Sequence, residues 1–336
     1  MSEAPISARA TSVPRRLVQA WRRVWFPLAP LSDLAIARVL LALIVLWLNG
    51  RSRFASVANA PAFTWDPVAL VRLLGLDQPS AEQMHALHVA TRALLVAGGL
   101  GIFTNLALLG AFLLQLLQEA LLNCFGKVAH STIPLLHAML FLALSPCGRV
   151  WSVDALVRRR WRGAEPRHDV AARSSRFARW PFELLFVELA FYYFDAGLSK
   201  VVTSGFAWAD GATLQYYLLH RGLPAGEWVA SSLTLCRVLS WGALLFELGF
   251  PLAIVVRRLR LPFLGLGVLF HLGNHVLMNL SFWPVPATYL LAVPWSELRR
   301  TLGGRRRSPA ADAEPSGETS SAPPRRALAA GGKLAT

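Results

Sequence analysis

The apolar segment that ends at Lys200 carries the residue in this chain whose type points most directly to acid–base chemistry. Of 34 basic residues only three are lysines, Lys127, Lys200 and Lys333, and the rest are arginines. Arginine stays protonated in proteins, whereas a lysine desolvated in an apolar site can act as a base. The competing interpretation is a lysine at a helix end that extends its ammonium to the membrane surface.

The composition is that of a membrane protein. Hydrophobic residues make up 54% of the 336 residues, charged residues 16%, and the mean hydropathy is +0.44. Several apolar runs of about 20 residues match the thickness of a bilayer. The net charge of +15 comes mainly from arginines between these runs, a pattern of membrane topology rather than of nucleic-acid binding. We therefore expect the lipid bilayer, and no nucleic acid, as a partner.

We predict an all-α fold, a polytopic bundle of transmembrane helices. The predicted spans are residues 33–49, 86–103, 105–123, 131–147, 181–200, 237–256, 261–280 and 283–297. The second and third are separated only by Phe103-Thr104-Asn105, which predicts a tight helical hairpin. Residues 1–30 are predicted to hold a disordered start and an interfacial basic amphipathic helix, residues 31–297 the transmembrane domain, and residues 298–336 a disordered tail.

The arginine distribution predicts the orientation. With a cytoplasmic N-terminus, the segments on the inner side hold 25 lysines and arginines, and the outer half of the map holds 8. The excess of positive charge inside predicts that both termini are cytoplasmic. Together with the Arg- and Ala-rich composition, this predicts a multi-pass protein of a bacterial inner membrane.

Polar side chains inside the predicted spans share one depth. Gln115, Glu119 and Asn123 follow i, i+4 spacing on one face of the third span. His130 opens the fourth span, Lys200 ends the fifth, Glu247 lies in the sixth, and the seventh carries His271, Asn274 and His275 on one face. Because intramembrane polar groups are costly, their convergence predicts one polar cavity open to the outer side. Hydrogen bonds between helices, worth about 1 kcal/mol each, are the alternative.

The histidines and cysteines predict no metal centre. His271 with His275, and His85 with His88, have helical spacings that a metal could use. No carboxylate completes a recognised ligand pattern, so hydrogen bonding is the favoured role. The three cysteines are Cys124, Cys147 and Cys236. The first and last fall near the outer surface, where a disulfide could persist, but no spacing rule pairs them, and free thiols are favoured.

Four blocks of residues resemble the horizontally transferred transmembrane (HTTM) family, to which the vitamin K-dependent gamma-glutamyl carboxylase belongs. The blocks are His130-Ser131; Trp151-Ser152-Val153-Asp154-Ala155-Leu156; Ala196-Gly197-Leu198-Ser199-Lys200 with Trp208 and Gly211; and Phe270-His271 with Asn274. They span residues 130–275, and the pattern of spans extends the similarity over residues 30–297.

The resemblance implies chemistry on a reduced quinone. In the carboxylase, the lysine that ends the Ala-Gly-x-x-Lys block deprotonates vitamin K hydroquinone, which implies this role for Lys200. The deprotonated quinol reacts with O2, and the strong base so formed removes a proton from a substrate glutamate, which captures CO2. The resemblance also implies that His130 and His271 lie near the quinone with Asn274 beside them, and that residues 151–156 are structural. Reduced vitamin K or menaquinol is thus the implied cofactor, with O2 and CO2 as co-substrates.

The residues around Lys200 agree with such a role. Tyr193, Ala196 and Gly197 share its helical face, and two small residues would let a ring approach closely. The candidate catalytic residues are Lys200 and His130. The candidate cofactor-binding residues are His271, Asn274, His275, Tyr193 and Glu119.

One departure from the carboxylase bears on the substrate. The carboxylase carries a large extramembrane domain that helps to bind the propeptide of its substrate, whereas residues 298–336 are predicted to be disordered. Epoxidation of a quinol alone, or chemistry on another peptide or protein substrate, stays open. A rival hypothesis is a non-enzymatic membrane protein that binds a lipid, a peptide or a partner protein in the same cavity. A transporter is disfavoured because the inner halves of the spans are too apolar.

Overall fold

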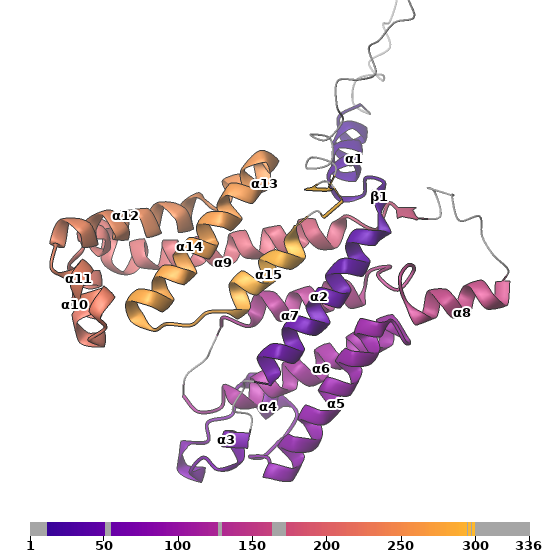
Figure 1. The fold of residues 1–336 in the computed structure, drawn as a ribbon, viewed down its shortest axis with the longest axis horizontal. Coiled ribbons are helices and arrows are strands. Elements are labelled where there is room, and N and C mark those ends of the chain that lie inside the picture. Colours follow the sequence, from indigo (N-terminus) through magenta and orange to yellow (C-terminus); the bar gives the residue numbers. More distant parts are fainter. Residues whose placement is uncertain are drawn as a thin grey trace, which may run out of the picture. The chain divides into compact units, whose positions relative to one another are not determined.

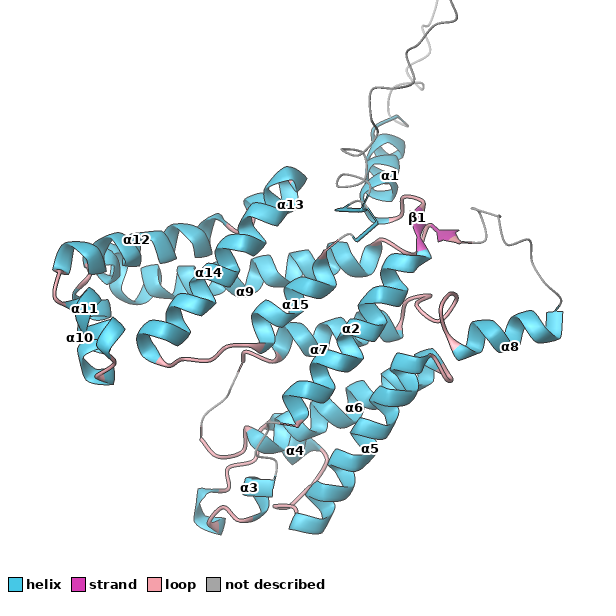
Figure 2. Ribbon diagram, viewed as in Figure 1, coloured by secondary structure: helices cyan, strands magenta, loops and turns pink. Residues whose placement is uncertain are grey.

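The computed structural model describes residues 12–50, 55–126, 130–162, 173–293, 295–296 and 298–299. The chain separates into two units, residues 1–298 and 299–336, and the first is described here. The segments predicted to be disordered, at residues 1–11 and from residue 300 onward, lie outside the described residues. Figure 1 traces the helices in chain order, and Figure 2 shows how little of the described chain is strand.

The helices and strands follow one another along the chain with short connections. Their bounds are α1 Ser12–Trp25, β1 Ala29–Pro30, α2 Leu31–Asn49, α3 Ala55–Ala58, α4 Ala69–Leu73, α5 Ala81–Leu100, α6 Thr104–Leu122, α7 Ile133–Ala143, α8 Val153–Arg162, β2 Ser174–Ser175, α9 Trp180–Ser204, α10 Ala212–Arg221, α11 Pro224–Ala230, α12 Leu233–Gly249, α13 Leu252–Val255, α14 Arg260–Met278 and α15 Pro284–Ala292. Short 3₁₀-helices occupy Ala62–Thr64, Gly205–Asp210 and Arg257–Leu259.

Over the part of the chain that the structure describes, the fold is all-α apart from one short strand pair. Two-residue strands β1 and β2 pair antiparallel, with Ala29 opposite Ser175 and Pro30 opposite Ser174. They join the entry of α2 to the chain just before α9. The sequence did not predict this pairing, because two-residue strands leave no pattern of alternating side chains.

Each of the eight predicted spans contains a helix, but the helices differ in length and polarity. Three are long and apolar enough to cross a membrane: Leu31–Asn49, Thr104–Leu122 and Arg257–Met278. A fourth follows if α11 and α12, which meet at a bend of 103°, count as one span. Helix α9 is longer still but carries four charged residues, and α7 and α15 are short. Eight full-length spans thus remain a prediction.

The apolar faces of the long helices meet in one core. Helix α6 packs on α5 and α7, α2 packs on α5, α7 packs on α9, and α15 packs on α2 and α7. Fully buried members of this core include Leu34, Leu41, Leu108, Met139 and Leu189. The chain after α15 is also hydrogen-bonded to α2: Ser296 donates from its backbone N and its Oγ to the Asp33 carboxylate, at 2.9 and 2.6 Å. The core therefore joins helices from both ends of the domain.

The predicted hairpin is present between α5 and α6, and it depends on Gly101. This residue has φ of +80°, and a Cβ at this position would lie 2.2 Å from the Cβ of Ser152. Glycine is the residue that tolerates both conditions. The 151–156 segment thus packs directly on the hairpin, which gives it the structural role that was predicted.

Asp154 completes the contact by capping α6. Its carboxylate accepts hydrogen bonds from Phe103 N at 2.9 Å, Thr104 N at 2.8 Å and Thr104 Oγ1 at 2.6 Å. Burial alone would raise the pKa of the Asp154 carboxyl, but the hydrogen bonds from Thr104 and Phe103 and the charge of Arg158 outweigh it and hold that pKa below its usual value. A carboxylate at a helix N-terminus is favoured by the free N–H groups there.

We expect Asp154→Asn to lower the free energy of unfolding by about 1–2 kcal/mol at pH 7, because an amide cannot accept all three bonds. The folded-state pKa lies below the unfolded value of about 3.9, so the wild-type advantage is complete above that pH and is lost as the pH falls through the folded value. Thermal unfolding of purified protein at pH 7 and pH 3 measures both effects, with the exposed Asp77→Asn as control. An equal difference at both pH values would contradict this assignment.

Two buried arginine clusters hold the helix ends. Arg38 of α2 is 0% exposed and donates to the carbonyls of Gly99 at 3.3 Å, Cys147 at 2.8 Å and Val150 at 3.4 Å, and also to Trp151 O. It thereby ties α2 to the end of α5 and to the chain after α7. The second cluster surrounds Glu183 at the start of α9. Its carboxylate forms ion pairs with three arginines, whose nitrogens lie 2.6 Å (Arg260), 2.8 Å (Arg179) and 3.3 Å (Arg257) from the carboxylate oxygens.

Candidate functional site

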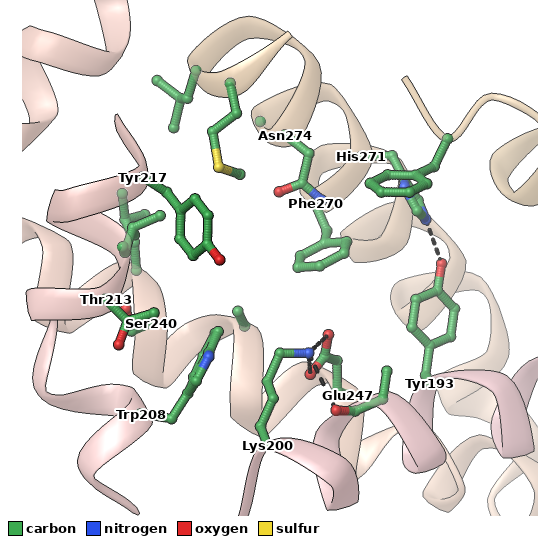
Figure 3. A pocket seen from close by; sticks show the side chains of 18 of the residues that line it. Tyr193, Lys200, Trp208, Thr213, Tyr217, Ser240, Glu247, Phe270, His271 and Asn274 are labelled. Atoms are coloured by element: carbon green, nitrogen blue, oxygen red, sulfur yellow. Dashed lines mark hydrogen bonds and ion pairs between the residues drawn. The ribbon is translucent and has the colours of Figure 1, made fainter. Parts of the chain in front are cut away.

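A cavity of about 410 Å³ lies among α9, α10, α12, α14 and the 3₁₀-helix Gly205–Asp210. Figure 3 shows its centre open, with side chains from these elements around it. Most of the wall is apolar or aromatic. The polar side chains that line it are His130, Lys200, Thr213, Ser240, Glu247, His271 and Asn274, together with the tyrosines Tyr192, Tyr193 and Tyr217. This is the size and composition typical of small-molecule sites.

Lys200 forms an ion pair with Glu247 in the wall of this cavity. Its Nζ lies 2.8 Å from Oε1 and 2.7 Å from Oε2 of Glu247, and 3.2 Å from Ala196 O. The lysine side chain is 25% exposed and the glutamate side chain 4%. Both side chains line the cavity, and Figure 3 shows the carboxylate beside the ammonium.

Gly197 allows this pair to form. A Cβ at Gly197 would lie 3.0 Å from the Cβ of Glu247 and 3.0 Å from Leu248 Cδ2. Helix α12 therefore approaches α9 closely at this turn, which brings the Glu247 carboxylate within reach of Lys200 one turn further along α9. The sequence predicted that Gly197 would make room for a ligand ring. Its open side is instead filled by α12, and Gly197 does not line the cavity.

Trp208 covers the lysine from the other side. The Lys200 ammonium lies 5.1 Å from the centroid of the Trp208 ring, a cation–π distance. The 3₁₀-helix that carries Trp208 ends at Asp210 and is followed by Gly211, which has φ of +95°. A Cβ there would lie 2.6 Å from Arg237 N. Glycine at this position lets the segment pack against the start of α12 and fixes Trp208 over the site.

A second polar group of the wall is a buried network of α9, α14 and α15. Tyr193 Oη lies 2.7 Å from His271 Nε2 and also hydrogen-bonds with Tyr289 Oη. All three side chains are buried, and Tyr193 and His271 line the cavity. Within the described part of the chain, His271 Nδ1 has no hydrogen-bond partner. Tyr193 and Tyr289 thus fix the orientation of the His271 ring.

Of the predicted site residues, five meet at this cavity: Lys200, His130, His271, Asn274 and Tyr193. In Figure 3 the Asn274 amide and the Tyr217 hydroxyl point into the open centre, across from Lys200. His130 lies at the edge, with its ring centroid 6.1 Å from that of Tyr192.

Two predicted residues lie elsewhere. His275 does not line the cavity: its Nδ1 lies 3.0 Å from Ser281 Oγ, and its ring lies 5.1 Å from that of Trp283. Glu119 lines a separate cavity of about 220 Å³ and accepts hydrogen bonds from Gln115 and Thr132, both at 3.1 Å. The expectation of one shared cavity is therefore met only for part of the polar set, because α6 packs on α5 and α7 rather than on α9 and α12.

The cysteines agree with the prediction of free thiols. Cys124, Cys147 and Cys236 are all buried and unpaired with one another. Cys124 and Cys236 belong to separate hydrophobic clusters, so their thiols do not meet.

Sequence reasoning placed Glu247 among the polar residues that converge on the cavity but did not make it a candidate site residue, and it did not assign Ser240. A charged residue at mid-span was the available signal for Glu247, but nothing in the sequence identified Lys200 as its partner. Ser240 carried no signal. Its Oγ is buried at the cavity and has no hydrogen-bond partner among the described residues, a group that a ligand would satisfy.

The fold and the site together define the class of this protein. Large apolar side chains are exposed along the helices, among them Leu43 of α2, Phe191 of α9, Leu245 of α12 and Leu269 of α14. Exposed apolar faces on helices long enough to cross a bilayer characterise an integral membrane protein.

The family follows from comparison with known proteins. The family model of the HTTM domain matches residues 27–294, and the chain therefore belongs to the HTTM family. This relates it to the gamma-carboxylase family. No curated protein and no solved structure matches the chain.

Proposed function

We propose that this protein acts on a reduced quinone, a vitamin K hydroquinone or menaquinol, with Lys200 as the base. The observation that carries the proposal is the Lys200 ammonium, which faces an apolar-walled cavity between a buried carboxylate and the Trp208 ring. A base with its own proton acceptor, in a site that admits a ring, suits removal of a proton from a ring hydroxyl.

The residues of the cavity fit such a ligand. Aromatic side chains of Tyr192, Trp208, Phe270 and Phe282 line it, and its volume of about 410 Å³ admits a bicyclic ring. Polar groups stand on opposite sides, with Lys200 on one and Asn274 on the other. The unpartnered Ser240 Oγ offers a further hydrogen bond. When bound, the quinol would supply, by its reaction with O2, a base stronger than any side chain.

The location we propose is a bacterial inner membrane, crossed several times with both termini cytoplasmic. In that orientation the Lys200 end of α9 and the cavity lie in the outer half of the bilayer. The partners we propose are the bilayer, a quinone and a peptide or protein that receives the base. Whether CO2 is then added depends on that substrate.

A second function rests on the apolar walls of the same cavity. A non-enzymatic protein that holds a lipid, a peptide or a partner segment there would use Lys200 and Glu247 only as an ion pair, without proton transfer. Such a site needs the charge of Lys200 but not its proton transfer, so the two functions differ in which residues are tolerated at position 200.

The first test uses the full chain purified in detergent or nanodiscs. With reduced menaquinone-4 and O2, we expect formation of the epoxide, measured by chromatography, and we expect Lys200→Ala to lower it by about 10²–10⁴-fold. Asp195→Asn, which removes an exposed carboxylate from the same helix, serves as the control and should leave the rate unchanged. Absence of turnover by the wild-type protein over several quinols would reject the redox function.

A further inference from the structure

We propose that Glu247 is the proton store of the site: it takes the proton of Lys200, so that the lysine meets its ligand as a neutral amine. The inference rests on the proposed function, since it assigns the partner of the proposed base. It also gives a role to the buried carboxylate of Glu247, which contacts Lys200 although the two residues lie 47 positions apart in the sequence.

The geometry provides a direct path for the proton. Both Glu247 oxygens lie within 2.8 Å of Lys200 Nζ, so the proton moves along an existing hydrogen bond. Glu247 is 4% exposed and the lysine side chain 25% exposed. Both side chains line the cavity, and Nζ, the more exposed of the two groups, is the one that a ligand meets first.

The charge of the pair favours an exchangeable proton. Among the described residues, the ion pairs of Glu247 involve Lys200 alone, and this pair holds one positive and one negative charge. The other titratable side chains of the wall are His130 and His271 and the tyrosines Tyr192, Tyr193 and Tyr217. Proton transfer within the pair removes both charges, and a low-dielectric surrounding reduces the cost of that step. The net charge of the site is zero before and after.

Glu183, which lies on α9 with Lys200, shows the contrasting arrangement. It is as buried as Glu247 but is held by Arg179, Arg257 and Arg260. Arginine does not give up its proton in proteins, so that cluster is fixed in its charged form. Helix α9 therefore carries a permanent ion cluster near its start and a pair capable of proton exchange near its end.

The proton balance of the step is simple. The Nζ–H bond of Lys200 breaks and an O–H bond forms on Glu247, which leaves a neutral amine beside a carboxylic acid. The amine nitrogen then takes the hydroxyl proton of the ligand, which becomes an oxyanion beside the restored ammonium. One proton has passed from the ligand to Glu247 through Lys200, and no charge has been gained or lost. The ligand class that this requires is a neutral ring compound with an acidic hydroxyl.

The pH dependence of Lys200 reactivity tests the proposal. In the wild-type protein, Lys200 and Glu247 share one proton across neutral pH. The share of the pair in which Lys200 is the neutral amine then does not depend on pH, so the reactivity of Lys200 should be flat from about pH 6 to 9. In Glu247→Gln the lysine must lose its proton to water, and the neutral amine rises about tenfold per pH unit. Glu247→Asp should restore the flat profile at a lower level, and Asp195→Asn should behave as wild type.

Two readouts follow this profile in the full chain. The first is turnover of reduced menaquinone-4 under O2. The second needs no quinol: it is the rate at which acetic anhydride acetylates Lys200, followed by mass spectrometry with Lys127 and Lys333 as internal references. Because the lysine side chain is 25% exposed, a small reagent can reach it.

The outcomes separate the two proposals. A flat acetylation profile in wild type and a rising one in Glu247→Gln support the proton store, even if no quinol is turned over, in which case the proposed function alone fails. Parallel profiles in the two proteins overturn the store. A flat turnover profile in Glu247→Gln, lowered equally at every pH, also overturns it, because that result assigns Glu247 a role in positioning only.

Discussion

Replacing Lys200 with arginine is expected to reduce quinol turnover by about a thousandfold while the protein stays folded. Arginine keeps the positive charge, and its guanidinium can still pair with Glu247. It does not deprotonate in proteins, so neither proton exchange within the pair nor removal of a ligand proton is possible. The measurement is epoxide formation by wild type and Lys200→Arg under identical conditions.

Thermal unfolding of the same two samples controls for structural damage. We expect similar unfolding temperatures, because the ion pair with the buried carboxylate is retained. Lys200→Met, which leaves Glu247 without its partner, should unfold at a lower temperature. Wild-type turnover by Lys200→Arg would show that charge alone suffices at this position, and would favour a binding protein over an enzyme.

Replacing Arg38 with methionine is expected to lower the free energy of unfolding by about 3–5 kcal/mol. Methionine matches the length of the arginine stem but donates no hydrogen bond. The carbonyls of Gly99, Cys147, Val150 and Trp151, which Arg38 now joins, would lose their shared donor. Because Arg38 is fully buried, water does not readily replace it. Recovery of monodisperse protein and its unfolding temperature are the readouts.

Arg38→Lys separates the charge from the hydrogen bonds. An ammonium has a different geometry and reaches fewer carbonyls than the guanidinium fork, so we expect an intermediate loss. Arg72→Met, at an exposed position on α4, should change the unfolding temperature little. If Arg38→Met were as stable as Arg72→Met, the junction of α2, α5 and the chain after α7 would not depend on this residue.

The helices within the eight predicted spans were predictable because each contains an apolar run. The shorter helices α3, α4, α8, α10 and α11 lie outside those runs and were not predicted. The α5–α6 hairpin was also visible in sequence, since a polar turn separates two such runs. The differences arise where tertiary contacts decide. Helix α12 ends at Gly249, two residues before Pro251, whereas the predicted span runs on to residue 256. Its start at Leu233 follows the bend between α11 and α12. Neither feature appears in hydropathy.

The proposed base, Lys200, could be predicted from the sequence, but the side chain that pairs with it, Glu247, could not. Lys200 is conspicuous because lysine is rare in the chain. His271 and Asn274, which share one face of α14, line the same cavity. His275 lies one turn from His271, yet its ring turns to Ser281 and Trp283 because the chain reverses after α14. The contact of Glu247 depends on how closely two helices approach at Gly197, which no local pattern encodes.

The hydrogen bonds from Ser296 to Asp33 have a consequence for the order of biosynthesis. Asp33 lies in the first turn of α2 and Ser296 follows α15, so Asp33 is made well before Ser296 during translation. Before α15 is made, α2 can pack on α5 and α7, but its Asp33 carboxylate lacks the Ser296 donors. The contacts around α2 are therefore complete only after α15 and Ser296 have been made.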